Sequence, residues 1–444
     1  MNVTYLMAIL LLSIALIVFL IMKLRLNAFV ALTIAGLALG IAAGMPLSDV
    51  AVSFQNGMGS TLGFLATVLG LGTILGKMLE VSGGAQRLAQ TLVRVFGEKR
   101  APWAMMVVGF LCGIPVFFQV GFVLLIPVIF SIARQANMPL VKIGIPVVAS
   151  LITVHAMVPP HPAALAVVNQ LGADVGTVIV LSLLVGIPAV IIAGPVYGNW
   201  VSRRTVTDPP ADLVIDEVIP EEKLPGFGIT LFTILLPMII MVVKTIVDLL
   251  APEGAAYLGF VDFVGNPITA LLLSALFAYW SLGLARGMNM ERIGKLTEEC
   301  FKPVASILLI IGAGGAFNQV LQDSGVGDAL AEVLTDIHLS PIVMAWLVAL
   351  VMRFAVGSTT VAMVTSAGIV APLIASSGAS PAVMCLAVGA GGIGLSHVND
   401  SGFWIVKEYF GMPLKDTFKT WTAATTIASV MALLGTLLVG LVVR

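Results

Sequence analysis

Two histidines and three prolines interrupt an otherwise apolar run in the stretch HAMVPPHPAAL (155–165). Proline ends or kinks a helix and leaves nearby carbonyl groups free to bind a ligand or water. The imidazole of His155 can relay a proton near neutral pH, or it can stay neutral and hydrogen-bond a freed carbonyl. His161 either faces an outer mouth of the fold or contacts a ligand. The pattern predicts an unwound segment with candidate binding side chains.

A second interruption, SHVNDSGFW (396–404), carries adjacent polar residues inside an apolar run. Asp400 is the carboxylate best suited to carry a proton, and the alternative is that it caps a helix. Asn399 beside it is a candidate ligand-binding amide. His397, which lies 242 residues after His155, poses the same choice between a proton relay and a structural hydrogen bond.

Two further interruptions, GIPVFFQVG (113–121) and VGSTTVAM (356–363), offer amide and hydroxyl groups. Gln119 in the first can hydrogen-bond hydroxyls but cannot carry a proton. The second holds the candidate binding residues Gly357, Ser358, Thr359 and Thr360. Hydroxyls and free backbone amides at a helix start suit an anionic or polyhydroxylated ligand, and a plain helix cap is the competing explanation.

Arg353 is the only basic residue in its apolar block, 340–376. A buried guanidinium is costly alone and pairs bidentately with a carboxylate. We therefore expect its partner to be either a ligand anion or Asp400.

Metal chemistry is not indicated by the sequence. His155 and His161 are separated by prolines, with neither an HExxH arrangement nor an obvious third ligand. Cys112, Cys300 and Cys385 are scattered and odd in number, which predicts neither a disulfide framework nor a metal cluster. We expect no metal, no cofactor and no enzymatic activity.

The bulk composition places these groups in a membrane. Of 444 residues, 59% are hydrophobic and 10% are charged, with a mean hydropathy of +1.09, whereas soluble proteins carry roughly 25% charged residues. Lipid is the expected environment, and no basic patch suggests nucleic acid.

Apolar stretches long enough to cross the hydrocarbon core recur along the chain. The expected spans are 4–23, 28–45, 59–80, 140–157, 174–202, 226–250, 267–285, 302–321, 382–398 and 420–443. Two more apolar blocks, 102–136 and 340–376, are too long for one helix and are broken by Gly and Pro. We expect paired helices or re-entrant hairpins there.

The two halves of the chain resemble each other. Residues 69–92 align with 311–334 at a spacing of 242 with eight identities, and His155 and His397 keep the same spacing. Such self-similarity indicates a duplication.

The charges of the loops predict that the two copies are inverted. In each matched pair only one loop is basic: 84–101 but not 326–340, 286–302 but not 46–58, and 406–419 but not 158–174. Cytoplasmic loops collect Lys and Arg, so the copies should have opposite orientations. Both termini are then periplasmic and the acidic, proline-containing linker 203–225 is cytoplasmic.

The predicted architecture is an all-α polytopic membrane protein with 12–14 membrane segments. Two inverted-topology repeats, 1–202 and 226–444, each contribute about 5–7 segments with re-entrant hairpins or broken helices. Secondary transporters have this organisation, with the binding site near the bilayer midplane. A channel is the alternative, but an ion-selective pore needs a ring of like charges or carbonyls, and the four interruptions have mixed polarity.

At these residues the sequence resembles the gluconate permease family of proton symporters (GntP-type) over essentially the whole chain. The motifs that carry the resemblance are GGAQRLAQTL, PVFFQVGFVLLIP, VPPHPAAL, LIIGAGGAFNQVLQDSGV, GSTTVAMVTSAGIVAPLI and SHVNDSGFWIVKEYFG. The resemblance implies import of D-gluconate or a related sugar acid with protons across the bacterial inner membrane. It also implies a homodimer with an elevator-like motion and a proton gradient as the energy source.

The resemblance leaves the substrate open among gluconate, idonate, fructuronate and D-serine. The family pattern usually has Glu where this chain has Gln119 in FFQVGF. A proton cannot be carried at that position here, so Asp400, His397 and His155 become the candidates for proton coupling.

Overall fold

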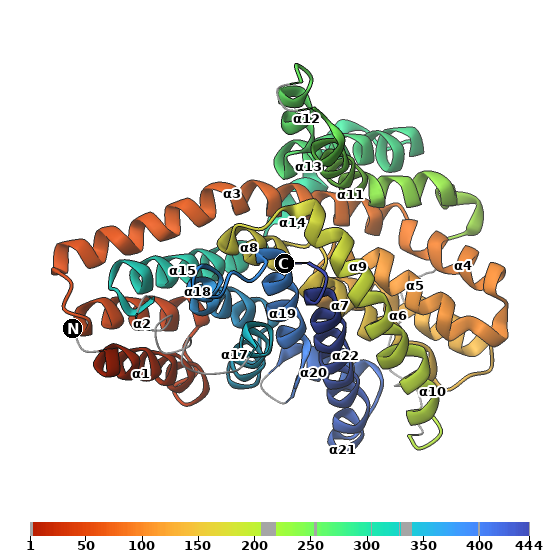
Figure 1. The fold of residues 1–444 in the computed structure, drawn as a ribbon. Coiled ribbons are helices and arrows are strands. Elements are labelled where there is room, and N and C mark those ends of the chain that lie inside the picture. The colour runs from red at the N-terminus through yellow and green to blue at the C-terminus, as the bar shows by residue number, and fades with distance from the viewer. Residues whose placement is uncertain are drawn as a thin grey trace.

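The structure, a computed structural model, describes residues 3–205, 219–252, 255–302, 304–327, 329, 340–397 and 400–443, and in these ranges every regular element is helical (Figure 1). The helices of the first half are α1 (Val3–Met22), α2 (Ala28–Ala42), α3 (Leu47–Val81), α4 (Gly84–Phe96), α5 (Ala101–Gly113), α6 (Phe118–Gln135), α7 (Leu140–Met157), α8 (Pro162–Leu171), α9 (Val175–Ile191) and α10 (Tyr197–Val201). Those of the second half are α11 (Phe227–Leu250), α12 (Leu258–Gly265), α13 (Pro267–Ala278), α14 (Met290–Phe301), α15 (Val304–Asp323), α17 (Pro341–Val356), α18 (Thr359–Ser377), α19 (Pro381–Ile393), α20 (Ser401–Tyr409), α21 (Leu414–Thr417) and α22 (Ala423–Gly440).

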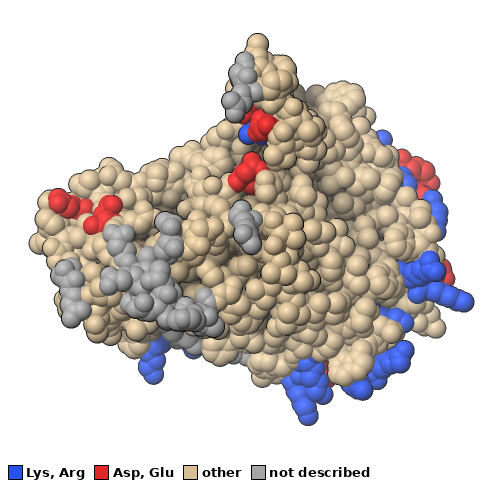
Figure 2. Space-filling model, viewed as in Figure 1, with Lys and Arg blue, Asp and Glu red and all other residues tan. Residues whose placement is uncertain are grey.

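The helices confirm the expected polytopic membrane protein. Among the described residues, nine helical segments are long and apolar enough to cross a membrane, and four shorter apolar helices accompany them. Figure 2 shows wide areas of one face without charged side chains, and Lys and Arg side chains gather toward the lower and right-hand margins of the view. A surface of this kind suits contact with lipid.

The long apolar blocks are broken where the sequence predicts. The first block divides into α5 and α6 at residues 114–117, and the second into α17 and α18 at residues 357–358. Glycine and proline at these points end one helix before the next begins.

The boundary predicted at residues 46–58 is wrong. The sequence places a loop at 46–58 before a span at 59–80, but α3 is a single helix of 35 residues that begins at Leu47. The polar residues there do not end the helix because one side of it is buried against α15. Ser53, for example, is buried and donates a hydrogen bond to Asp323 over 2.7 Å.

Helix boundaries recur at the 242-residue spacing. Shifted by that amount, α6 falls on 360–377, where α18 lies, and α5 falls on 343–355, inside α17. The second copy differs from the first at α19. This helix ends at Ile393, before the position that is equivalent to Met157, where α7 ends. This recurrence fits a duplication, and the opposite orientation of the halves and their limits remain predictions.

The C-terminal end of the linker binds both halves. Gln86 in α4 exchanges two hydrogen bonds with the backbone of Ile219, at 2.7 and 3.1 Å. Arg94 donates to the Glu221 carboxylate over 2.9 Å, and this hydrogen bond, with the charges of Arg94 and Arg87, lowers the pKa of Glu221. On the other side, Arg286 donates to the carbonyl of Lys223 over 2.7 Å. Residues 206–218 lie outside the described part of the chain.

Close packing of α3 on α15 depends on Gly57. A Cβ atom at Gly57 would lie 2.7 Å from the carbonyl oxygen of Gly315 and 2.8 Å from Cα of Ala316, whereas nothing lies within 4 Å of a Cβ at Gly59. We expect Gly57→Val to reduce the free energy of unfolding by about 1–3 kcal/mol, as overpacking does in cores. Thermal unfolding in detergent, with Gly59→Val as the matched control, measures this. Equal melting temperatures for the two variants would contradict the packing.

Candidate functional site

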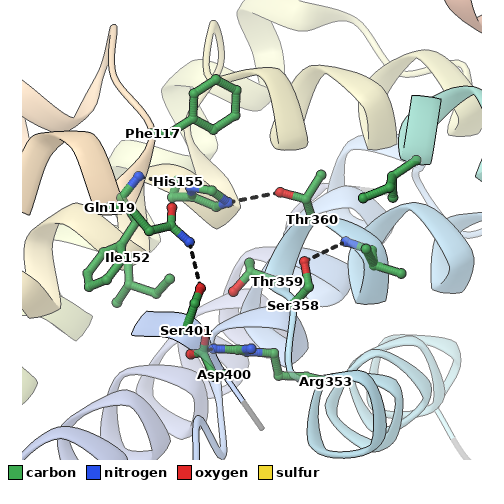
Figure 3. A pocket seen from close by; sticks show the side chains of 13 residues that line it. Phe117, Gln119, Ile152, His155, Arg353, Ser358, Thr359, Thr360, Asp400 and Ser401 are labelled. Atoms are coloured by element: carbon green, nitrogen blue, oxygen red, sulfur yellow. Dashed lines mark hydrogen bonds and ion pairs between the residues drawn. The ribbon is translucent and has the colours of Figure 1, made fainter. Parts of the chain in front are cut away.

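The four interruptions of the helices meet around one cavity of about 100 Å³ (Figure 3). Its lining residues are Phe117, Phe118, Gln119, Ile152, His155, Ile310, Arg353, Ser358, Thr359, Thr360, Val361, Asp400 and Ser401. The two hairpin tips, the end of α7 and the start of α20 each contribute polar groups. Segments far apart in the sequence therefore enclose a single polar site inside an apolar protein.

The tip of the α17–α18 hairpin is shaped by its caps. Gly357 has a φ of +78°, a left-handed conformation that glycine adopts without a steric penalty, and it ends α17. Ser358 caps α18 by accepting a hydrogen bond from the Val361 amide over 3.4 Å. The predicted helix cap is thus present, and the same turn places Thr359 and Thr360 at the cavity.

His155 joins the two hairpin tips. Its Nδ1 accepts from the backbone N–H of Phe118 over 3.4 Å, and its Nε2 lies 3.1 Å from Oγ1 of Thr360. Because Nδ1 accepts, the ring proton of a neutral imidazole lies on Nε2 and donates to Thr360. Both ring nitrogens are occupied in a buried setting. This geometry favours the structural alternative for His155 over proton relay, with an amide and a hydroxyl as its partners.

Arg353 and Asp400 form a buried ion pair. The Nη2 of Arg353 lies 2.5 Å from Oδ2 of Asp400, and the two side chains are 1% and 7% exposed. Nη1 of Arg353 also donates to the carbonyl of Gly357. Of the two partners that the sequence allows for Arg353, the structure shows the carboxylate of Asp400.

A hydrogen-bond network holds Asp400 in place. Its Oδ1 accepts from the Gly402 amide over 2.9 Å and so caps α20, and its Oδ2 also accepts from Ser396. Ser396 in turn accepts from Nε1 of Trp421 over 2.7 Å. Asp400 is therefore both a helix cap and the counter-ion of Arg353.

The buried pair balances its own charge. Removing one partner of such a pair leaves a buried charge without compensation and costs about 3–5 kcal/mol. The Nε of Arg353 has no hydrogen-bond partner among the described residues. An anion that entered the cavity would find a guanidinium already present, with a carboxylate competing for it.

Some predicted residues lie elsewhere. His161 is fully buried, caps α8, and lies behind His155 with 4.1 Å between the centroids of the tilted rings, so the expectation that it faces an outer mouth is wrong. His397 bonds the carbonyl of Phe354 over 2.9 Å and is not among the residues that line the cavity. Gly357 contributes its backbone to the tip. Asn399 lies outside the described residues.

The structure adds residues that sequence reasoning did not select. Phe117 and Phe118 form an aromatic wall at the first tip, and Ser401 accepts a hydrogen bond from Nε2 of Gln119 over 3.2 Å. The two Phe residues lie inside a predicted interruption, which is the one signal that points to them. Ile152 and Ile310 lie within apolar helices, where composition does not distinguish cavity from core.

The arrangement can bind an organic anion with hydroxyl groups. Arg353 supplies positive charge, and the hydroxyls of Ser358, Thr359 and Thr360 with the amide of Gln119 supply donors and acceptors. Within the described residues, no group of three His, Cys, Asp or Glu side chains is placed to hold a metal ion. The chemistry offered here is recognition of an anionic, hydrogen-bonding ligand.

Comparison with known proteins gives consistent results. The sequence model of a family described as GntP family permease matches residues 5–442. The chain is 47% identical over 427 residues to a gluconate permease of Pseudomonas aeruginosa, covering 95% of each chain. It is 47% identical over 442 residues to the D-serine transporter DsdX of Escherichia coli, covering 98% of each. The solved YdaH transporter of Alcanivorax borkumensis is similar in fold, with a TM-score of 0.61 at 16% identity over 93% of this chain and 97% of that one.

A double-mutant cycle tests the buried pair. We expect Arg353→Gln and Asp400→Asn each to reduce the free energy of unfolding by about 3–5 kcal/mol, and the double variant to lose at least about 1 kcal/mol less than their sum. Unfolding in detergent by heat or denaturant measures the three values.

The exposed pair of Lys295 and Glu291, 2.8 Å apart with side chains 70% and 74% exposed, is the matched control. The cycle of Lys295→Gln and Glu291→Gln should give a coupling of about 0.5 kcal/mol or less. Additive losses at Arg353 and Asp400 would show that the two charges do not interact.

Proposed function

This chain belongs to the GntP family of permeases, and from that premise we propose that it imports D-gluconate or a closely related sugar acid by proton symport. It is a multi-pass membrane transporter and not an enzyme. The observation that carries the proposal is the Arg353–Asp400 pair in a cavity lined with hydroxyl groups.

The substrate carboxylate binds Arg353. A guanidinium recognises a carboxylate through two parallel N–H donors, and Arg353 is the cation among the cavity residues that the structure describes. The substrate hydroxyls then bond Ser358, Thr359, Thr360 and Gln119. A chain of hydroxyl groups matches this lining better than an apolar ligand would.

Charge balance couples the proton to the substrate. The cavity holds one guanidinium and one carboxylate, so their charges cancel. A bound anion without a proton would leave an uncompensated negative charge in a buried site, which is strongly unfavourable. If Asp400 takes up one proton as the substrate carboxylate replaces it on Arg353, the site stays neutral. One proton per sugar acid follows from this exchange.

D-Serine is the second candidate, because a D-serine transporter is equally similar over the chain. An amino acid brings an ammonium group that needs an acceptor, best supplied by a carboxylate. Among the described residues of the cavity Asp400 alone has a carboxylate, and Arg353 already occupies it. This favours a sugar acid over an amino acid.

The transporter works in the bacterial inner membrane by alternating access. The alternation of basic loops supports two inverted repeats in the bacterial inner membrane, with periplasmic termini and a cytoplasmic linker. The family resemblance supports a homodimer that works by an elevator-like alternating access. The proton gradient supplies the energy, and no cofactor takes part.

Substrate identity is tested by competition in proteoliposomes. We expect unlabelled gluconate, and to a lesser degree idonate and fructuronate, to reduce uptake of labelled gluconate, while D-serine competes at least tenfold more weakly, about 1.4 kcal/mol or more. Uptake should require a proton gradient that is directed into the vesicles. If D-serine competes as well as gluconate does, the amino acid becomes the better substrate.

The roles of the ion pair are separated by two variants. Arg353→Ala removes the anion anchor, so gluconate affinity measured by calorimetry should fall at least tenfold. Asp400→Asn is a neutral mimic of the protonated carboxyl, so binding should persist while accumulation driven by a pH gradient is lost. Full accumulation by Asp400→Asn would remove Asp400 from proton coupling.

A further inference from the structure

A second, larger cavity meets the binding cavity at Gln119. This vestibule has a volume of about 500 Å³ and lies between α4, α6, the end of α3 and the linker. Its walls include Glu80, Gln86, Val123 and Ile219. Gln119 lines both cavities, so its side chain lies at the boundary between them.

The boundary is spanned by one hydrogen bond. Gln119 points from the tip of the α5–α6 hairpin toward the start of α20, and its Nε2 donates to Oγ of Ser401 over 3.2 Å (Figure 3). Ser401 is exposed, whereas its neighbour Asp400 is buried. The bond therefore lies at the rim of the cavity, where it connects the two halves of the chain.

The vestibule is lined in part by the basic segment 84–101. Its lining residues include Gly83, Ala85 and Gln86 around the start of α4, and Ile219 in the linker. Ala85 and Gln86 belong to the basic segment 84–101, which contains α4 and holds Arg87, Arg94, Lys99 and Arg100. Segments rich in Lys and Arg face the cytoplasm, so the predicted orientation puts the vestibule on the exit side for imported substrate.

We propose that the Gln119–Ser401 hydrogen bond is the inner gate of the transporter, and that the sugar acid leaves through the vestibule when this bond opens. The inference rests on the proposed function and deepens it. A neutral, partly exposed hydrogen bond is weak, so it can open and close in every transport cycle. Substrate hydroxyl groups can bond either partner and so replace the bond as the ligand passes.

If the Gln119–Ser401 hydrogen bond is the gate, a covalent tether between these two side chains should block release of the sugar acid. The test uses Gln119→Cys together with Ser401→Cys, in a background in which Cys112, Cys300 and Cys385 are replaced by Ala. A short bis-methanethiosulfonate reagent bridges the two thiols in proteoliposomes, and dithiothreitol removes the bridge. We expect bridging to reduce gluconate uptake at least tenfold and reduction to restore it.

Retention of bound substrate gives the more specific readout. Protein loaded with labelled gluconate before bridging should release the label at least tenfold more slowly than the reduced protein. The two single-Cys variants, treated with the same reagent, carry the modification without the bridge. They should release the label as fast as the double-Cys protein does after reduction by dithiothreitol. A second control, Val123→Cys alone, places a modified thiol in the vestibule away from the gate.

Each outcome decides the proposal. A bridge that forms but leaves uptake and release unchanged overturns the gate, and so does failure of the bridge to form, because the side chains then do not meet. The background protein separates the two hypotheses. If it transports D-serine and not gluconate, the proposed substrate is wrong, and the same release measurement with labelled D-serine still tests the gate.

Discussion

The rest of the structure depends on keeping one guanidinium and one carboxylate buried together in an apolar protein. Neither charge is tolerable alone at that depth, so the fold must bring Arg353 at the end of α17 to Asp400 at the start of α20. Both helices are interrupted at that level, and the network through Ser396 and Trp421 fixes the carboxylate. The pair balances its own charge, and in the proposed mechanism it exchanges partners only when another carboxylate and a proton arrive together.

The broken helices make this exchange possible. A continuous helix satisfies its own backbone groups and offers nothing to a ligand, whereas each break frees amides and carbonyls at the depth of the pair. His155 then connects one hairpin tip to the other through Phe118 and Thr360, so the tips are held as a unit. On the other side of the cavity, Gln119 in α6 donates a hydrogen bond to Ser401 in α20. A rigid link between the tips on one side of the cavity and a weak, neutral hydrogen bond on the other are what a gated binding site needs.

The sequence was sufficient for the positions of the breaks and for naming Asp400 as one of two possible partners of Arg353, because glycine, proline and isolated charges stand out against an apolar background. It was insufficient where tertiary contacts decide. The polar start of α3 is helical because α15 covers it, and His161 is buried because the α7–α8 turn folds it behind His155. The Gln119–Ser401 contact joins residues 282 positions apart, and no local pattern encodes such a distance.

Proton uptake on substrate binding tests the central claim most directly. Calorimetric titration of the detergent-solubilised protein with gluconate, in buffers of different ionisation enthalpy, gives the number of protons bound with each ligand. The exchange on Arg353 predicts about one proton per gluconate for the unmodified protein, as its charge balance requires, and none for Asp400→Asn. Binding of gluconate to the unmodified protein without proton uptake would contradict the account.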